Sequence, residues 1–202
     1  MHQTVSRIIP LLIALCWTMP LAAQETGLPF VHNYSPREYN AHVQNWDATQ
    51  DSRGVFYFAN TDGVLIYDGS YWDLVRLPGD MSVRAVEFGP DSLLYVASLG
   101  GAGVLRPDTL GKLHYKPLLS NKKGRYADFY NIWETYKLNN GMLFIAQDRL
   151  FLYDIKNDTI RTWKAQNKFR QSCIFQGTFW TLDAGFGLRY IEGDELVTAN
   201  TN

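Results

Sequence analysis

The chain has 202 residues, of which 46% are hydrophobic and 14% aromatic, so it carries enough apolar material for a folded domain with its own core. Disordered chains lack aromatic and β-branched residues, and this composition excludes disorder as the main character of the chain. The 19 basic and 20 acidic residues leave a formal net charge of −1, which argues against a protein that binds nucleic acid by neutralising phosphates.

The first 23 residues have the layout of a secretory signal peptide. Arg7 precedes an apolar run at residues 8–21, and two alanines follow that run. The run is shorter than the about 20 apolar residues that a membrane-spanning helix needs. We therefore expect residues 1–23 to be removed and residues 24–202 to be exported to the periplasm or cell envelope, without a membrane span.

After residue 40 the sequence repeats a hairpin pattern about every 40 residues. Each copy has a run of aromatic or β-branched residues, a short turn rich in Gly, Asp or Asn, and a second such run. This order is typical of two antiparallel strands joined by a tight turn. The expected turns are Thr61–Gly63, Leu99–Gly103, Gln147–Arg149 and Asp183–Gly187.

A further run precedes and follows each hairpin, which gives four short strands per unit, the size of one propeller blade. The expected units are 41–79, 80–119, 129–166 and 169–198, with the polar insertion 120–125 in a surface loop and 131–138 as an inner strand. A β-sandwich also has closely spaced strands, but it does not predict an equivalent hairpin in every unit. The sequence thus predicts an all-β propeller chain at 24–202, with about four four-stranded antiparallel blades.

No constellation of catalytic or metal-ligating residues is visible after residue 23. His32, His42 and His114 fall in different parts of the chain and lack ligand spacing. The glycine-rich run 98–103 lacks the Lys-Ser/Thr ending of a phosphate-binding loop, and no serine stands in a Gly-x-Ser-x-Gly elbow. We expect no catalytic residue, no metal and no cofactor in this chain.

Other conspicuous residues have structural interpretations. Cys173 lies in an expected strand and is predicted to be a small buried hydrophobe. The dispersed acids recur at turns, where they can accept backbone N–H groups, and a glycosidase-type acid pair is the alternative; they are Asp62, Asp68, Asp73, Asp91, Asp148 and Asp154. Most aromatic residues are expected to pack between blades, and a minority to stack on a ligand such as a sugar ring; the tryptophans are Trp46, Trp72, Trp133, Trp163 and Trp180.

The first unit resembles the two-component-regulator propeller repeat. The resemblance rests on Asn45-Trp46, on 50–60, on Gly63-Val64-Leu65 and on Tyr67-Asp68-Gly69 followed by Trp72, together with the lead-in 28–39 and the stretch 103–108. It implies the N-terminal sensor region of a Bacteroidetes-type signalling protein. In that family a seven-bladed periplasmic propeller precedes a triple-tyrosine domain, a membrane helix and an output domain such as a histidine kinase, a LuxR-type helix-turn-helix, a cyclase or a phosphatase.

The resemblance implies a non-catalytic extracytoplasmic sensor or ligand-binding region of a membrane signal-transduction protein. A secreted carbohydrate-active or other propeller enzyme, and a protein-interaction module, are the alternatives. The expected partners are a carbohydrate or other small ligand, and further blades or a second chain. The sequence assigns no ligand-binding residue. Because the first and last units lack a neighbour, we expect an N-terminal fragment of a larger propeller that self-associates or unfolds easily by itself.

Overall fold

The computed structural model describes residues 31–120 and 131–199. The signal peptide expected at 1–23 and most of the insertion expected at 120–125 lie outside the described residues. The chain divides into two units, Met1–Asn33 and Tyr34–Asn202, and all four sheets belong to the second. Among the described residues, every helix is too short or too polar to cross a membrane.

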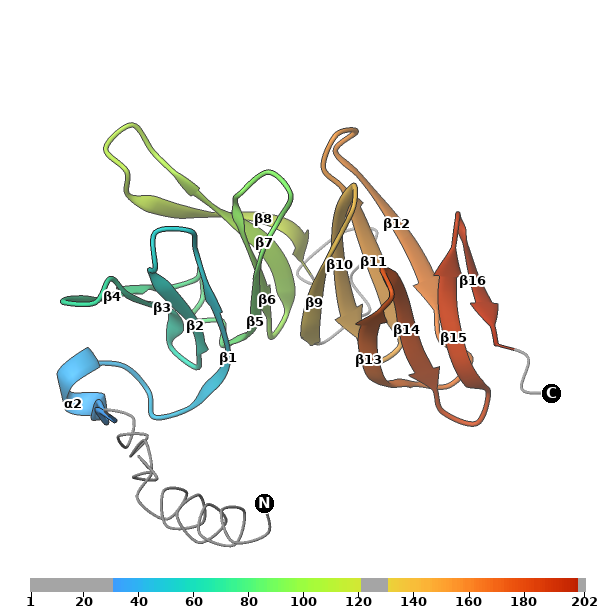
Figure 1. Cartoon of the computed structure of the whole chain (residues 1–202), viewed down its shortest axis with the longest axis horizontal. Helices are drawn as coiled ribbons and strands as arrows, with labels where there is room; N and C mark the ends of the chain where they lie inside the picture. The colour runs from blue at the N-terminus through green and yellow to red at the C-terminus, as the bar shows by residue number, and fades with distance from the viewer. Residues whose placement is uncertain (1–30, 121–130, 200–202) are drawn as a thin grey trace, which may run out of the picture. The chain divides into compact units, whose positions relative to one another are not determined.

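Sixteen strands make up four antiparallel four-stranded sheets in the described part of the chain (Figure 1). The first two sheets are β1–β4 (Asn45–Gln50, Phe56–Asn60, Gly63–Tyr67, Trp72–Val75) and β5–β8 (Val83–Phe88, Leu94–Ser98, Gly101–Pro107, Leu113–Ser120). The last two are β9–β12 (Ile132–Leu138, Gly141–Ala146, Arg149–Asp154, Thr159–Lys164) and β13–β16 (Phe169–Phe175, Thr178–Asp183, Gly187–Glu192, Glu195–Thr198). Within every sheet each strand pairs with the next in the chain, which confirms the predicted fold class of consecutive propeller blades.

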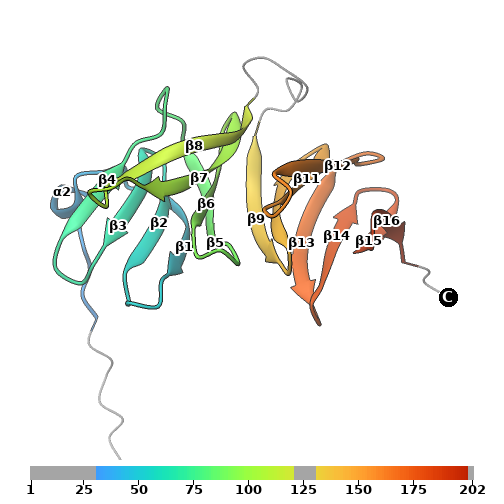
Figure 2. The same cartoon turned by 90° about the horizontal axis from the view of Figure 1, so that it is seen from above.

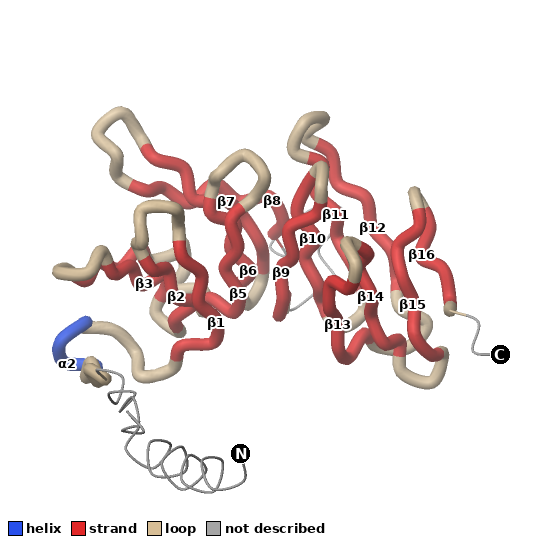
Figure 3. The backbone as a smooth tube through the Cα atoms, in the orientation of Figure 1, coloured by secondary structure: helices blue, strands red, loops and turns tan. Residues whose placement is uncertain are grey.

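The one helix of the described residues is the single turn α2 (Pro36–Tyr39), which precedes the sheets (Figure 3). The ring of Tyr39, buried at its end, lies 5.4 Å from the ring of Trp72 on β4, measured between centroids. This contact ties the lead-in of the repeat to the outer strand of the first sheet.

Three hairpin turns lie inside the predicted ranges, and the predicted turn Leu99–Gly103 is too long. Strand β7 already begins at Gly101, which pairs with Ser98. The positive φ that the turn needs is supplied by Gly100 alone, at 92°. The glycine at 103 has another reason, because a Cβ there would lie 2.5 Å from the ring of Tyr115.

The hydrophobic core lies between neighbouring sheets, which stand side by side in chain order (Figure 2). Tyr57 and Leu105 belong to the layer between the first and second sheets, and Tyr95 and Phe144 to the layer between the second and third. Phe179 belongs to the layer between the third and fourth. These buried rings fill the space between blades, as expected for most of the aromatic residues.

No other described sheet covers the outward face of the fourth sheet, and Cys173 lies on this face. The cysteine is exposed, so the prediction that it is a buried hydrophobe is wrong. Cys173 stands opposite Trp180 in the register of β13 and β14, and Leu182 shares this face two residues further on. Its burial depends on a neighbouring sheet, which the strand pattern around the cysteine does not reveal.

Candidate functional site

A β-bulge interrupts the start of the first strand in each of the four sheets. The register shifts between Asn45 and Asp47 in β1, and between Val83 and Ala85 in β5. The same shift occurs around Trp133 in β9 and between Phe169 and Ser172 in β13. Bulges re-aim a side chain and are over-represented beside functional sites, so four of them at equivalent positions mark this end of the sheets.

The extra residues of the first three bulges are Trp46, Arg84 and Trp133, which we call the axial site. They stand near the starts of β1, β5 and β9, and β5 lies beside both other strands. In a propeller the blades surround a central channel, and the first strand of each blade is the one that faces it. Three consecutive sheets therefore contribute one large side chain each at the same ends of their first strands.

The Arg84 guanidinium contacts both indoles. Its Cζ atom is 3.8 Å from the centroid of the Trp46 ring and 5.4 Å from that of Trp133, distances at which a cation is attracted to a ring face. The Trp46 Nε1–H donates to the Thr61 hydroxyl at 3.3 Å, which fixes that indole. The indoles remain 47% and 43% exposed, so much of their surface is open to a ligand.

The Arg84 charge lacks a protein counter-charge within the described ranges. Its Nε and Nη1 atoms are buried and donate to no partner there, and none of the ion pairs found in those ranges includes Arg84. Burial lowers the pKa of Arg84, although an arginine remains protonated in proteins. By contrast, a carboxylate pairs with each of Arg53, Arg149, Arg161 and Arg189.

The acids on the inner strands are engaged in structural contacts. Asp47 accepts the Val86 N–H at 3.0 Å and so links the first sheet to the second. Burial raises the pKa of Glu134, whose carboxylate accepts the Tyr136 hydroxyl at 3.2 Å. Burial also raises the pKa of Glu87. No pair of these carboxylates is placed by a contact for general acid and base work.

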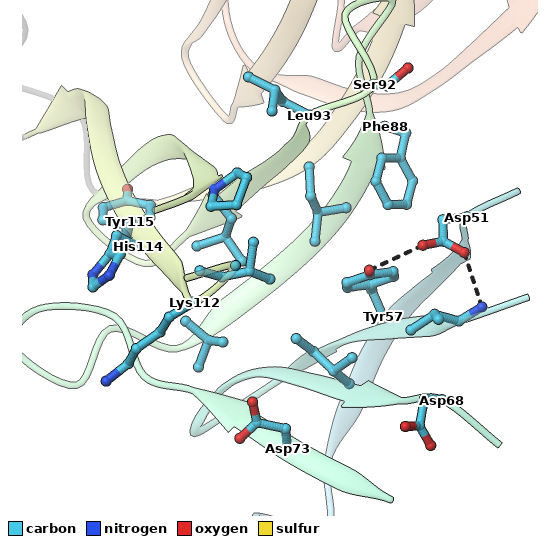
Figure 4. Close-up of a pocket in the computed structure, with 18 of the residues that line it drawn as sticks. Asp51, Tyr57, Asp68, Asp73, Phe88, Ser92, Leu93, Lys112, His114 and Tyr115 are labelled. Atoms are coloured by element: carbon cyan, nitrogen blue, oxygen red, sulfur yellow. Dashed lines mark hydrogen bonds between the residues drawn. The ribbon is translucent and has the colours of Figure 1, made fainter. Parts of the chain in front are cut away.

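A cleft of 1430 Å³ between the first and second sheets is a second candidate site (Figure 4). At one end the Tyr57 hydroxyl donates to Asp51 at 3.2 Å. Burial would raise the pKa of Asp51, but hydrogen bonds from the Arg53 side chain and from backbone N–H groups outweigh it and lower that pKa. The Tyr115 hydroxyl in the wall is buried, and burial raises its pKa to about 12.

The polar side chains that line the cleft mainly make structural contacts. Asp51 is occupied by the turn that it closes, accepting the N–H groups of Arg53 and Val55. His114 Nε2 lies 2.8 Å from Asp108 Oδ2, at the outer edge of the sheet. No nucleophile beside a base is formed among these groups, so the axial site is the stronger candidate.

Three of the six predicted turn acids behave as the sequence predicts, whereas Asp73 lies within strand β4 and Asp148 pairs with the Arg149 side chain. Asp68, Asp91 and Asp154 each accept a backbone N–H within their own turns. His42 accepts the Gln44 N–H, 3.0 Å away. Within the described ranges, the His, Cys, Asp and Glu side chains form no group of three that could hold a metal ion.

Sequence reasoning did not single out the axial site, although a signal for it exists. Each of its residues stands 13 positions before one of the equivalent alanines Ala59, Ala97 and Ala146 of the repeat. Comparing the same position in every unit therefore finds a large side chain in each. Counted in the same way from Leu182, the corresponding residue of the fourth unit, this position is Phe169, which is buried. The exposed Arg170 follows it within the bulge of β13.

The comparisons with known proteins identify the fold first. No family model matches the chain, and no curated protein matches its sequence. Among solved structures, virginiamycin B lyase from Staphylococcus aureus superposes with a TM-score of 0.60 at 12% identity, over 78% of this chain and 56% of that one. The chain thus has the β-propeller fold and spans about half the length of the lyase.

The same fold is found in bacterial sensor proteins. The extracellular domain of the hybrid two-component system BT3049 from B. thetaiotaomicron superposes with a TM-score of 0.62 at 17% identity, over 81% of this chain and 24% of that one. The extracellular domain of BT4673 from the same organism superposes with a TM-score of 0.61 at 13% identity, over 82% of this chain and 24% of that one. At the level of fold, these likenesses confirm the resemblance to regulator propellers. The chain spans about a quarter of these sensor domains.

Proposed function

We propose that this chain is part of an exported, non-catalytic sensor propeller that binds a small ligand at the axial site, in a membrane signal-transduction protein. One observation carries the proposal: Trp46, Arg84 and Trp133 converge at equivalent bulges of three successive sheets. A half-exposed pair of indoles beside an unpaired cation favours a binding surface, since exposed aromatic surface and a positive charge stand together. The fold shared with extracellular domains of regulators supports a sensory role.

A propeller enzyme is the second candidate, because the fold is shared with a lyase. The acids of the inner strands weigh against it in this chain. Asp47 and Glu134 are bound to a backbone N–H and to a tyrosine hydroxyl, respectively. A binding site without an acid and base in place holds its ligand and releases it unchanged.

Thermal melting of the full chain with a panel of neutral sugars, acidic sugars and organic anions tests the proposal. At least one compound is expected to raise the melting temperature, since a ligand at 100 times its Kd stabilises by about 2.7 kcal/mol. Trp133→Ala is expected to abolish the shift. Trp163→Ala is the matched control, because that indole also contacts an arginine but lies on the outer strand β12.

The stabilising compound should be recovered with its mass unchanged after prolonged incubation. Conversion into a product would contradict the non-catalytic role. An equal shift in the wild type and in Trp133→Ala would contradict the location of the site.

A further inference from the structure

The N–H groups of Arg84 determine which chemical class of ligand the axial site binds. The guanidinium Cζ lies 3.8 Å from the ring centroid of Trp46 and 5.4 Å from that of Trp133. Its Nε and Nη1 atoms are buried without a hydrogen-bond partner in the described ranges, so a ligand reaches this charge through the remaining nitrogen, Nη2. Arginine presents these donors in a rigid planar fork that matches a carboxylate.

Two acids adjoin this cluster in sequence, and both already accept hydrogen bonds. Glu134 follows Trp133, and its carboxylate accepts the Tyr136 hydroxyl at 3.2 Å. Asp47 follows Trp46 directly, but its Oδ2 accepts the Val86 N–H at 3.0 Å and its Oδ1 accepts the Ala48 N–H at 2.8 Å. Buried charges in proteins are normally paired. The negative partner of Arg84 is thus missing from the described chain.

A second arginine over an indole shows the usual arrangement. Arg161 lies over the Trp163 ring with its Cζ 6.0 Å from the centroid, and it forms an ion pair with Asp194. Arg84 contacts two rings and has no carboxylate partner among residues 31–120 and 131–199. The comparison favours a carboxylate as the group that Arg84 binds.

We propose that Arg84 binds the carboxylate of an anionic ligand whose body contacts Trp46 and Trp133. This inference rests on the proposed function, because it names the ligand class of the same site. Arg170, exposed at the corresponding bulge of β13, adds positive charge at the same ends of the inner strands and favours an anion. A sugar acid and a non-sugar organic acid share this chemistry.

Titration of the full chain with galacturonate, galactose and acetate tests the inference, followed by the indole N–H signals in ¹H–¹⁵N NMR spectra. Galacturonate is expected to shift the signals of Trp46 and Trp133, and galactose at the same concentration is not. Arg84→Met keeps the length and apolar stem of the side chain and should weaken galacturonate binding about tenfold or more, since charged hydrogen bonds are lost. Arg161→Met is the matched control and should leave the affinity unchanged.

The acetate arm separates the sources of the carboxylate. Acetate that shifts the same two signals with comparable affinity supports the inference with a non-sugar acid as ligand, and much tighter binding of galacturonate supports it with a sugar acid. Arg84→Lys serves if the methionine variant does not fold. It keeps the charge but loses the planar fork, and is also expected to bind galacturonate more weakly.

Two results would overturn the inference. One is equal binding of galactose and galacturonate with no effect of Arg84→Met, in which case a ligand site remains but the carboxylate does not define it. The other is the absence of any shift at Trp46 and Trp133 with either acid at tens of millimolar. A neutral compound that raises the melting temperature would then leave the proposed function standing.

Discussion

Replacing Phe144 by alanine is expected to lower the free energy of unfolding by about 3–5 kcal/mol, the usual cost of removing a fully buried aromatic ring. Phe144 on β10 is wholly inaccessible to solvent and lies in the core layer between the second and third sheets. Its ring centroid is 6.4 Å from that of Tyr95 on β6. The substitution therefore leaves a cavity in the core layer between the two blades.

Urea unfolding followed by tryptophan fluorescence measures this loss. Leu110→Ala is the control, because that side chain is 92% exposed in the turn before β8, and it should change the free energy of unfolding by less than about 0.5 kcal/mol. A similar small effect of Phe144→Ala would mean that the two sheets do not share a core.

Replacing Asp183 by alanine is expected to cost about 3–5 kcal/mol, because breaking a buried ion pair leaves the other charge unpaired. Asp183, at the end of β14, has no exposed surface. Its carboxylate accepts the N–H groups of Gln166 and Asn167 at 2.8 and 3.1 Å and pairs with Arg189 at 3.1 Å. It thus joins the connection from the third sheet to the last one.

The matched control is Asp194→Ala, which breaks the exposed ion pair with Arg161. Exposed pairs contribute little to stability, so this variant should unfold nearly as the wild type does. Equal effects of the two substitutions would contradict the role given to Asp183.

The pH dependence of stability provides a second readout for Asp183. Burial would raise its pKa, but the two backbone N–H groups and Arg189 outweigh burial and lower that pKa. A carboxyl group with a lowered folded pKa stabilises the fold above its unfolded pKa of about 3.9, and this contribution is lost as the pH falls through the folded value. Wild type should therefore lose more unfolding free energy than Asp183→Ala between about pH 5 and pH 2. Parallel curves for the two proteins would contradict this account.

The sheets could be predicted because their signals are local. The alternation of strands and the Gly, Asp and Asn residues at turns act over a few neighbours, so the hairpins after Asn60 and Ala146 follow from the sequence around them. The exact turn at Leu99 could not, because Gly103 is required by the packing of Tyr115 and not by the turn.

The axial site could not be predicted in the same way, because it depends on how separate sheets pack. A bulge at Trp46 is invisible in the alternation of β1, and its contact with Arg84 exists only when the first two sheets stand side by side. The prediction for Cys173 was wrong for the same reason, because its exposure depends on which sheet faces are covered by a neighbouring sheet. Patterns within a strand predict a sheet, and the packing between sheets decides what its side chains contact.

Hydrogen–deuterium exchange of the full chain, with and without a compound that raises its melting temperature, tests the central claim most directly. The account predicts slower exchange at the starts of the three inner strands, around Trp46, Arg84 and Trp133, and recovery of the compound unchanged. Protection confined to the cleft, around Asp51 and Tyr115, or conversion of the compound into a product, would contradict it.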